Sequence, residues 1–204
     1  RHRPRPEAHG RRHGRDLKVS KDGQVEMLPA NLSLMSDTAR LAKEIAARTD
    51  RIDVLLNNAG GTPSQQVITA EGYEATFTGN HLGHFLLTHR LMPLLKKTAA
   101  SQPKGSVRII NTSSSAHEHS PGFDWDDVQM LKKFMATPSY MNAKLANVYF
   151  TRSLAKRLAG EGIVVHAVHP GMVATNFSSY GDEAMQKHFV VHAERAISAA
   201  AGAD

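Results

Sequence analysis

Tyr140 and Lys144 are four positions apart and are the residues in this sequence best suited to proton chemistry. In a helix, side chains four residues apart lie on one face, so the phenol and the ammonium would be neighbours and the cation would stabilise a phenolate. A free tyrosine has a pKa near ~10, and bringing it close to neutrality requires roughly 3 to 4 kcal/mol of differential interaction. We expect Lys144 to supply much of this energy and Tyr140 to act as a general acid or base.

Two polar side chains upstream fit the same chemistry. Ser114 follows the apolar run 107–111, which is typical of a buried strand, and open α/β sheets bind ligands at the carboxyl ends of their strands. Ser113 and Ser115 compete for this role, and any of the three hydroxyls is also suited to ending the strand. Asn80 lies before a helical pattern, where its amide is expected either to hold a water for a proton relay or to satisfy a break in the helix.

These residues, taken in order, resemble the short-chain dehydrogenase/reductase family over residues 25–175. The resemblance implies a catalytic group of Asn80, Ser114, Tyr140 and Lys144. It also implies cofactor-binding residues, namely Asn31, Leu32, Asn57, Ala59, Gly60, Tyr140, Lys144, Pro170, Gly171, Val173 and Thr175. The turn at residues 57–60 has an alternative, purely structural interpretation, and Asn31 has one as an ordinary loop asparagine.

Within this family, the residues of segments 80–85, 114–117 and 139–147 most resemble those of the retinol dehydrogenases and the related WW-domain oxidoreductase-like enzymes. The resemblance implies an NAD- or NADP-dependent oxidoreductase that interconverts a small-molecule alcohol and a carbonyl compound. In that chemistry Ser114 would position the oxygen, and Lys144 would lower the pKa of Tyr140 and bind the nicotinamide ribose. Asn80 would complete the relay. A homo-oligomer packed through helices is also implied. The alternative is a noncatalytic scaffold of the same fold that cannot hold the dinucleotide.

Strand-like and helix-like segments alternate along the chain, which predicts an α/β fold with a doubly wound, mostly parallel, Rossmann-like sheet, incomplete at both ends. Ser36 is the expected cap of the first helix, and the second helix is expected to break near Asn80. The expected strands are residues 24–28, 53–56, 107–111 and 163–168, and the expected helices are residues 36–48, 73–97, 140–158 and 183–200. Residues 118–135 form an insertion that is expected to shape a substrate cleft.

The first 21 residues differ from the rest of the chain. They carry a net charge of +6, equal to that of the whole chain, so residues 22–204 are neutral in sum. Their glycines, Gly10 and Gly14, do not follow an apolar strand, as a dinucleotide-binding turn requires. We interpret residues 1–21 as a disordered or misassigned leader and residues 22–204 as a partial Rossmann-like domain. Nucleic-acid association through the basic leader is a weaker hypothesis.

Composition sets further limits. A chain of 204 residues with 41% hydrophobic content predicts one domain with a substantial core. The absence of cysteine excludes disulfides and thiolate chemistry and agrees with a cytoplasmic enzyme. No stretch reaches the ~18 apolar residues of a membrane span. His81 and His84 have the spacing of metal ligands, but no third ligand is evident, so no metal site is expected.

Overall fold

The computed structural model describes residues 25–174 together with residues 177, 187, 190, 191, 194, 196–199 and 201. The chain divides into two compact units, residues 1–30 and residues 31–204. In the first unit, residues 25–30 have no regular secondary structure, so the strand predicted at residues 24–28 is wrong for 25–28. A strand depends on ladder hydrogen bonds to a neighbour, and these residues pair with none of the described strands. Residue 24 and the leader at 1–21 lie outside the described residues.

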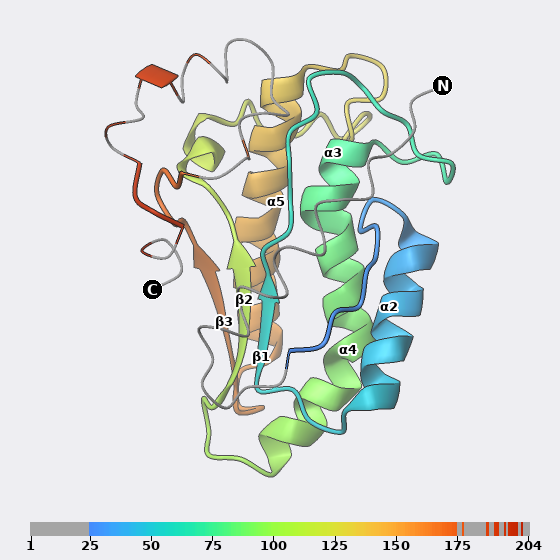
Figure 1. The fold of residues 1–204 in the computed structure, drawn as a ribbon, viewed down its shortest axis with the longest axis vertical. Helices are drawn as coiled ribbons and strands as arrows, with labels where there is room; N and C mark the ends of the chain where they lie inside the picture. The colour runs from blue at the N-terminus through green and yellow to red at the C-terminus, as the bar shows by residue number, and fades with distance from the viewer. Residues whose placement is uncertain are drawn as a thin grey trace. The chain divides into compact units, whose positions relative to one another are not determined.

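Three parallel strands form the sheet in the described part of the second unit. They are β1 (Val54–Asn57), β2 (Val107–Thr112) and β3 (Ile163–Val168), hydrogen-bonded in the order β1-β2-β3. This arrangement confirms the three predicted strands and the Rossmann-like α/β class. Because the strands are parallel, all three end at the same edge of the sheet (Figure 1).

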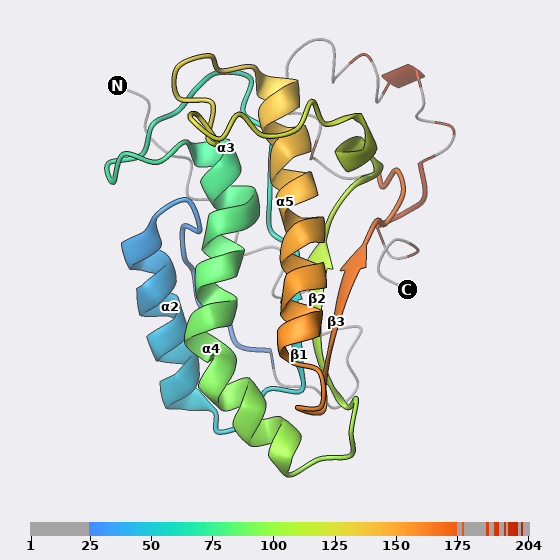
Figure 2. The ribbon, with the colours of Figure 1, turned by 180° about the vertical axis from the view of Figure 1, so that it is seen from behind.

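Helices α2 (Met35–Arg48), α4 (Gly83–Ala100) and α5 (Ala136–Arg157) are the long helices of this unit, and α4 and α5 pack on one face of the sheet (Figures 1 and 2). The predicted helix over 73–97 is divided, as expected, near Asn80. It consists of α3 (Ala75–Phe77), one turn of π-helix, η1 (Thr78–Leu82), and α4. A short 3-10 helix, η2 (Ser115–His119), follows β2. Helix α5 begins at Ala136, one turn before the predicted start.

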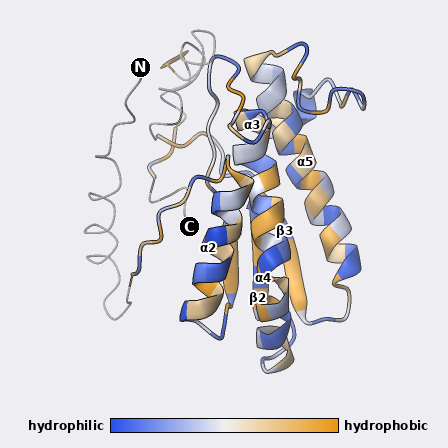
Figure 3. Cartoon of the chain, turned by 90° about the vertical axis from the view of Figure 1, so that its right-hand side faces the viewer, coloured by the Kyte–Doolittle hydropathy of each residue, from blue (hydrophilic) through white to orange (hydrophobic). Residues whose placement is uncertain are grey.

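The core lies between the sheet and helix α4. Leu91 and Leu95 of α4 and Val107 and Ile109 of β2 are 0–1% exposed, and burial of each such side chain contributes about 1.5 to 3 kcal/mol. Figure 3 shows β2 and β3 as largely hydrophobic strands beside helices of mixed character. Burial alternates along strand β1, since Leu55 is 9% exposed on one face and Leu56 is 56% exposed on the other.

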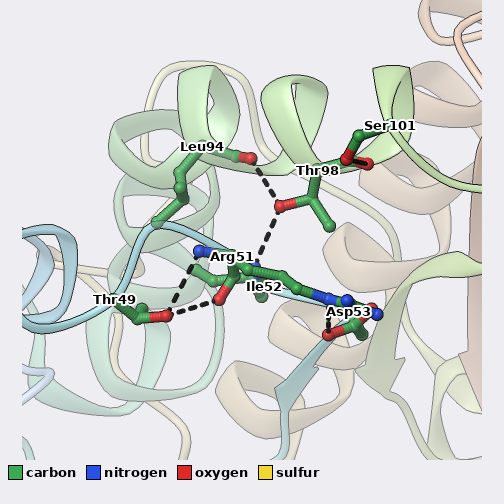
Figure 4. A network of polar contacts seen from close by, with 7 residues as sticks. All are labelled: Thr49, Arg51, Ile52, Asp53, Leu94, Thr98 and Ser101. Carbon is green, nitrogen blue, oxygen red and sulfur yellow. Dashed lines mark hydrogen bonds and ion pairs between the residues drawn. The ribbon is translucent and has the colours of Figure 1, made fainter.

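A polar junction fixes the chain between α2 and β1 (Figure 4). The hydroxyl of Thr98 on α4 accepts a hydrogen bond from the backbone N–H of Ile52 (3.0 Å) and donates to the carbonyl of Leu94 (2.9 Å). Thr49 and Arg51 bond to one another across the turn (2.8 and 3.2 Å). These bonds satisfy backbone groups that the strand ladder does not reach, so β1 enters the sheet in a fixed register.

Two carboxylates cap helices, and neither was identified from the sequence. Ser36, the predicted cap of α2, lies inside the helix, whose first N–H groups, those of Met35 and Ser36, donate to Glu71 (2.5 and 3.0 Å). Glu74 is fully buried and caps α3. The signal was hidden because Glu71 lies more than 30 residues from the helix that it caps, whereas capping rules read local sequence.

Glu74 gives the first testable prediction. Its carboxylate accepts from the N–H groups of Thr76 and Phe77 (2.9 and 2.8 Å) and from the Ser139 hydroxyl of α5 (3.2 Å). Glu74→Ala strands these buried donors, so we expect the free energy of unfolding in urea to fall by about 3 kcal/mol or more. Glu71→Ala is the matched control and is expected to cost less, because water can replace its more exposed carboxylate. Equal losses in the two variants would contradict this assignment.

Candidate active site

The carboxyl ends of the strands bring the predicted residues together at one edge of the sheet. Asn58 follows β1, Ser114 follows β2, and Pro170 follows β3. A hydrogen bond from the Thr112 hydroxyl to the Asn58 side chain (2.9 Å) ties the first two of these ends to one another. Parallel α/β sheets bind ligands at such an edge, so this is the candidate site.

Tyr140 and Lys144 lie on the buried face of α5, as their spacing predicted. Tyr140 is 8% exposed and Lys144 is 3% exposed, and the Lys144 Nζ lies 5.4 Å from the centroid of the Tyr140 ring. The Lys144 ammonium donates to the carbonyl of Thr112 at the end of β2 (3.1 Å). The ring of Phe177, which the sequence did not single out, packs against Tyr140 with centroids 5.5 Å apart.

The geometry separates the three candidate serines. The Ser114 side chain lies close enough to the Tyr140 hydroxyl to lower its pKa, and it accepts the N–H of Ala116 (3.2 Å) at the start of η2. The hydroxyl of Ser113 is buried and donates instead to the backbone carbonyl of Lys144 (2.9 Å). Ser115 is the first residue of η2. The hydroxyl that faces the phenol is therefore that of Ser114.

Burial dominates the protonation of the pair. It raises the pKa of the Tyr140 hydroxyl, and the hydrogen bond with Ser114 lowers that pKa by a smaller amount. Burial also lowers the pKa of Lys144 to about 8. The lowering of the Tyr140 pKa by Lys144 that the sequence led us to expect is not found in this arrangement, because desolvation disfavours the charged form of both groups.

Asn80 lies at the centre of the π-helical turn, and such turns are often found at functional sites. Its amide nitrogen donates to the carbonyls of Gly61 and Thr76 (2.7 Å each), so both amide protons are engaged. The Oδ1 of Asn80 is buried and accepts no hydrogen bond from the described residues. A methyl group built on Gly60 would lie 2.4 Å from this oxygen, which explains why glycine stands there.

Asn57 holds the strands together rather than facing a ligand. It is 1% exposed, and its amide nitrogen donates to Thr88 of α4 (2.9 Å) and to Asn111 of β2 (2.8 Å). These bonds agree with the structural role of the alternative interpretation, and the contact of Asn57 with a cofactor stays a prediction. Ala59 and Gly60, the other predicted residues of the turn, are exposed at the strand edge.

The predicted adenine-contacting segment, Asn31 and Leu32, lies against the start of α4. A methyl group on Gly83 would lie 2.4 Å from the Leu32 carbonyl, so the glycine lets the segment approach the helix closely. The Asn31 side chain accepts from the N–H of Ser33 (3.0 Å), which gives it the local turn role of the alternative interpretation.

The segment after β3 also lies at this edge. Gly171 has φ of 77°, a conformation that favours glycine, and Val173 forms a parallel bridge with Ile197. Pro170 is partly buried. Thr175, the last predicted cofactor contact, and most of the predicted helix over 183–200 lie outside the described residues.

Two polar residues that were not predicted to be part of the site complete its surroundings. Asn147 is 1% exposed, and its amide nitrogen donates to the carbonyls of Asn80 (3.0 Å) and Thr112 (3.2 Å). His84 is 2% exposed, and its Nδ1 lies 3.2 Å from the Asn80 carbonyl. A signal for Asn147 was present in the sequence, because it lies three residues after Lys144 and thus on the same helical face.

Over the described residues, no cluster of three or more potential metal ligands is found, and no helix is long and apolar enough to cross a membrane.

A family model described as short chain dehydrogenase matches residues 7–186. The chain belongs to the short-chain dehydrogenase family. Within this family its sequence is similar to retinol dehydrogenases. It is 40% identical to human retinol dehydrogenase 12 over 154 residues, which are 76% of this chain and 46% of that protein. It is 36% identical to mouse retinol dehydrogenase 14 over 159 residues, which are 78% of this chain and 46% of that protein.

Solved structures of other proteins agree with the fold. An uncharacterised protein from Mycobacterium paratuberculosis matches with a TM-score of 0.61 and 31% identity, covering 88% of this chain and 63% of that one. The NADP complex of RhlG from Pseudomonas aeruginosa matches with a TM-score of 0.61 and 26% identity, covering 85% and 64%. The chain spans about half the length of the curated relatives it matches.

The residues at this edge fit the nicotinamide-ribose half of a dinucleotide. An ammonium has three donors, and Lys144 directs one of them to Thr112. A methyl group built on Gly60 would lie 3.7 Å from the Lys144 Nζ, so the glycine leaves space beside the ammonium. The glycines at residues 10 and 14, which the sequence offered as a phosphate-binding turn, lie outside the described residues.

His84 leads to a prediction of pH-dependent stability. Burial, followed by the neighbouring Lys144 charge, lowers the pKa of His84 to about 4. An unfolded histidine titrates near ~6.5, so the unfolded chain binds more protons between these values, and stability should fall by up to about 3 kcal/mol as the pH drops from 6.5 to 4. Burial lowers the pKa of His81 in the same direction.

Urea unfolding between pH 4 and 7 measures this loss. His84→Gln should flatten the dependence, whereas His89→Gln, an exposed change on the same helix, should leave it as in the unaltered protein. A His84→Gln profile as steep as that of the unaltered protein would count against the assignment.

Proposed function

We propose that this chain is an NAD- or NADP-dependent oxidoreductase that interconverts a small-molecule alcohol and its carbonyl compound. The observation that carries the proposal is the buried Tyr140 phenol, which lies close enough to the Ser114 side chain for that side chain to lower its pKa, with the Lys144 ammonium 5.4 Å from the centroid of its ring. Two hydroxyls that meet in this way define one position for a substrate oxygen. The similarity to proteins named retinol dehydrogenases, and to RhlG in its NADP complex, supports the same class of reaction.

The bound nicotinamide would accept or deliver the hydride, and the protein would handle the proton. In carbonyl reduction, Tyr140 donates its phenolic proton to the substrate oxygen, and in alcohol oxidation it accepts the hydroxyl proton. Ser114 orients that oxygen by donating a hydrogen bond to it. Lys144 offers its remaining N–H donors to the ribose, and its positive charge favours phenolate when Tyr140 gives up its proton.

Tyr140→Phe tests the proton role. Because this substitution removes only the hydroxyl and keeps the ring, we expect the rate of carbonyl reduction to fall by about 100-fold or more. NADH and NADPH titrations followed by fluorescence should give unchanged dissociation constants, and the circular dichroism spectrum should stay the same. Tyr149→Phe, an exposed tyrosine on the same helix, is the matched control and should retain its rate.

Carbonyl reduction by Tyr140→Phe at a rate close to that of the unaltered chain would overturn the proposal. Titrations in which neither NADH nor NADPH binds the unaltered chain would favour the noncatalytic scaffold instead.

We also infer that a second copy of the chain covers an aromatic groove between α4, α5 and the insertion. Phe85 of α4, Tyr149 of α5 and Trp125 of the insertion line this groove of about 340 Å³ and are 46%, 51% and 79% exposed. Exposed apolar patches of this kind favour association. The groove uses the face of α5 that points away from Tyr140 and Lys144, so pairing would leave the candidate active site open.

Light scattering of the purified protein as it leaves a size-exclusion column tests this association. The double change of Phe85 and Tyr149 to serine removes the largest apolar contacts on the two helices, so we expect the measured mass to fall from that of an oligomer to that of one chain. Leu131→Ser, an exposed apolar residue outside the groove, is the control. An unaltered chain that is already a monomer would refute the inference.

A further inference from the structure

Asn147 is the one side chain of α5 whose amide reaches two backbone carbonyls of the candidate active site. Its nitrogen donates to Asn80 of η1 (3.0 Å) and to Thr112 of β2 (3.2 Å). Its own backbone carbonyl accepts from the Thr151 hydroxyl one turn later (2.8 Å). Three elements that are distant in sequence therefore meet at one buried amide.

The chemistry of these partners fixes the orientation of the amide. Carbonyl oxygens only accept, so the group that faces Asn80 and Thr112 must be the amide nitrogen, and the amide oxygen must face His81 Nδ1, 2.9 Å away. Because that oxygen also only accepts, Nδ1 of His81 carries the proton. Burial lowers the pKa of His81, which agrees with a neutral imidazole in this single tautomer.

Aromatic packing holds His81 in place. The ring centroids of Phe77, Phe85 and Phe150 lie 5.4, 6.3 and 6.1 Å from that of His81. The imidazole cannot turn without disturbing these rings, so its Nδ1–H stays directed at Asn147. The packing of these rings, which come from α3, α4 and α5, thus sets the orientation of the Asn147 amide.

The Thr112 carbonyl connects this amide to Lys144. It accepts both from the Lys144 ammonium (3.1 Å) and from Asn147 (3.2 Å). We propose that Asn147 is a positioning residue, which holds the Thr112 and Asn80 carbonyls together and thereby fixes where the Lys144 ammonium lies. The consequence for turnover rests on the proposed function, whereas the position of the ammonium does not.

The test is the pKa of Lys144 in the full chain without cofactor or substrate, measured as the pH dependence of its acetylation by acetic anhydride and read by peptide mass spectrometry. The titratable groups that face Lys144 are Tyr140 on its own helix and His84 on α4, and both stay unchanged in every variant. The unaltered chain should give the value of about 8 that burial produces.

Asn147→Asp keeps the shape of the side chain but places a carboxylate against the two carbonyls, so the Lys144 pKa should rise by about one unit or more. Asn147→Leu releases the Thr112 carbonyl and lets the ammonium reach water, so the pKa should rise as well. His81→Phe keeps the aromatic packing but frees the amide, and a smaller rise is expected. Asn142→Leu removes a similarly buried amide of α5, one that accepts from Ser120, and should leave the pKa unchanged.

A Lys144 pKa that stays near that of the unaltered chain in folded Asn147→Asp and Asn147→Leu would overturn the proposal, because a merely structural amide would lower stability alone. If the leucine variant does not fold, the isosteric aspartate variant and His81→Phe decide the question. An altered Lys144 pKa in a chain that binds no dinucleotide would support the positioning role and refute the proposed function, so the two failures are distinguishable.

Discussion

The buried ammonium of Lys144 is the constraint on which the candidate site depends. A charge taken out of water is costly unless hydrogen bonds replace the lost hydration. Lys144 is 3% exposed, and the hydrogen bond found for it among the described residues goes to a neutral carbonyl, that of Thr112. The compensation is therefore partial, which is why the pKa of Lys144 falls to about 8 and why its position follows that of a single backbone oxygen.

The end of β2 is held in place by a chain of amides and hydroxyls that crosses the molecule. Asn57 of β1 donates to Asn111 of β2 (2.8 Å), Asn111 donates to Thr151 of α5 (2.9 Å), and Thr151 donates to the carbonyl of Asn147 (2.8 Å). Buried polar networks of this kind are stable only when nearly every member is satisfied. Strand register and the placement of α5 are consequently linked to the site.

The local parts of this structure could be predicted from the sequence. The strands at 107–112 and 163–168 are apolar runs of the right length, and the Tyr140 to Lys144 spacing identifies one helical face. These signals depend on neighbours in the chain. The break near Asn80 was also expected, although its form, one π-helical turn, was not.

The remaining features depend on partners that are distant in sequence. Glu71 caps a helix that begins 36 residues earlier, and the choice between Ser113 and Ser114 is settled by which hydroxyl faces the Tyr140 phenol, because that of Ser113 donates to the Lys144 carbonyl instead. The strand expected at 24–28 has suitable residues, but composition cannot supply a pairing strand. The sequence predicted that Asn57 contacts a cofactor. It could not show that Asn57 is buried and bonded to α4, because this burial depends on the packing of α4 onto β1.

The protonation of the pair bears on the direction of the chemistry. Burial raises the pKa of the Tyr140 hydroxyl, so at neutral pH the phenol is protonated, which is the form that donates a proton to a carbonyl oxygen. Lys144, with a pKa of about 8, is still mainly charged there and opposes proton binding to its neighbour His84. The Lys144 ammonium lies 5.4 Å from the centroid of the Tyr140 ring, and burial has the largest effect on the pKa of each of these two groups. The arrangement therefore favours the protonated form of Tyr140, which can donate a proton. Alcohol oxidation needs the phenolate form, so the Lys144 charge would have to offset the effect of burial on the Tyr140 pKa.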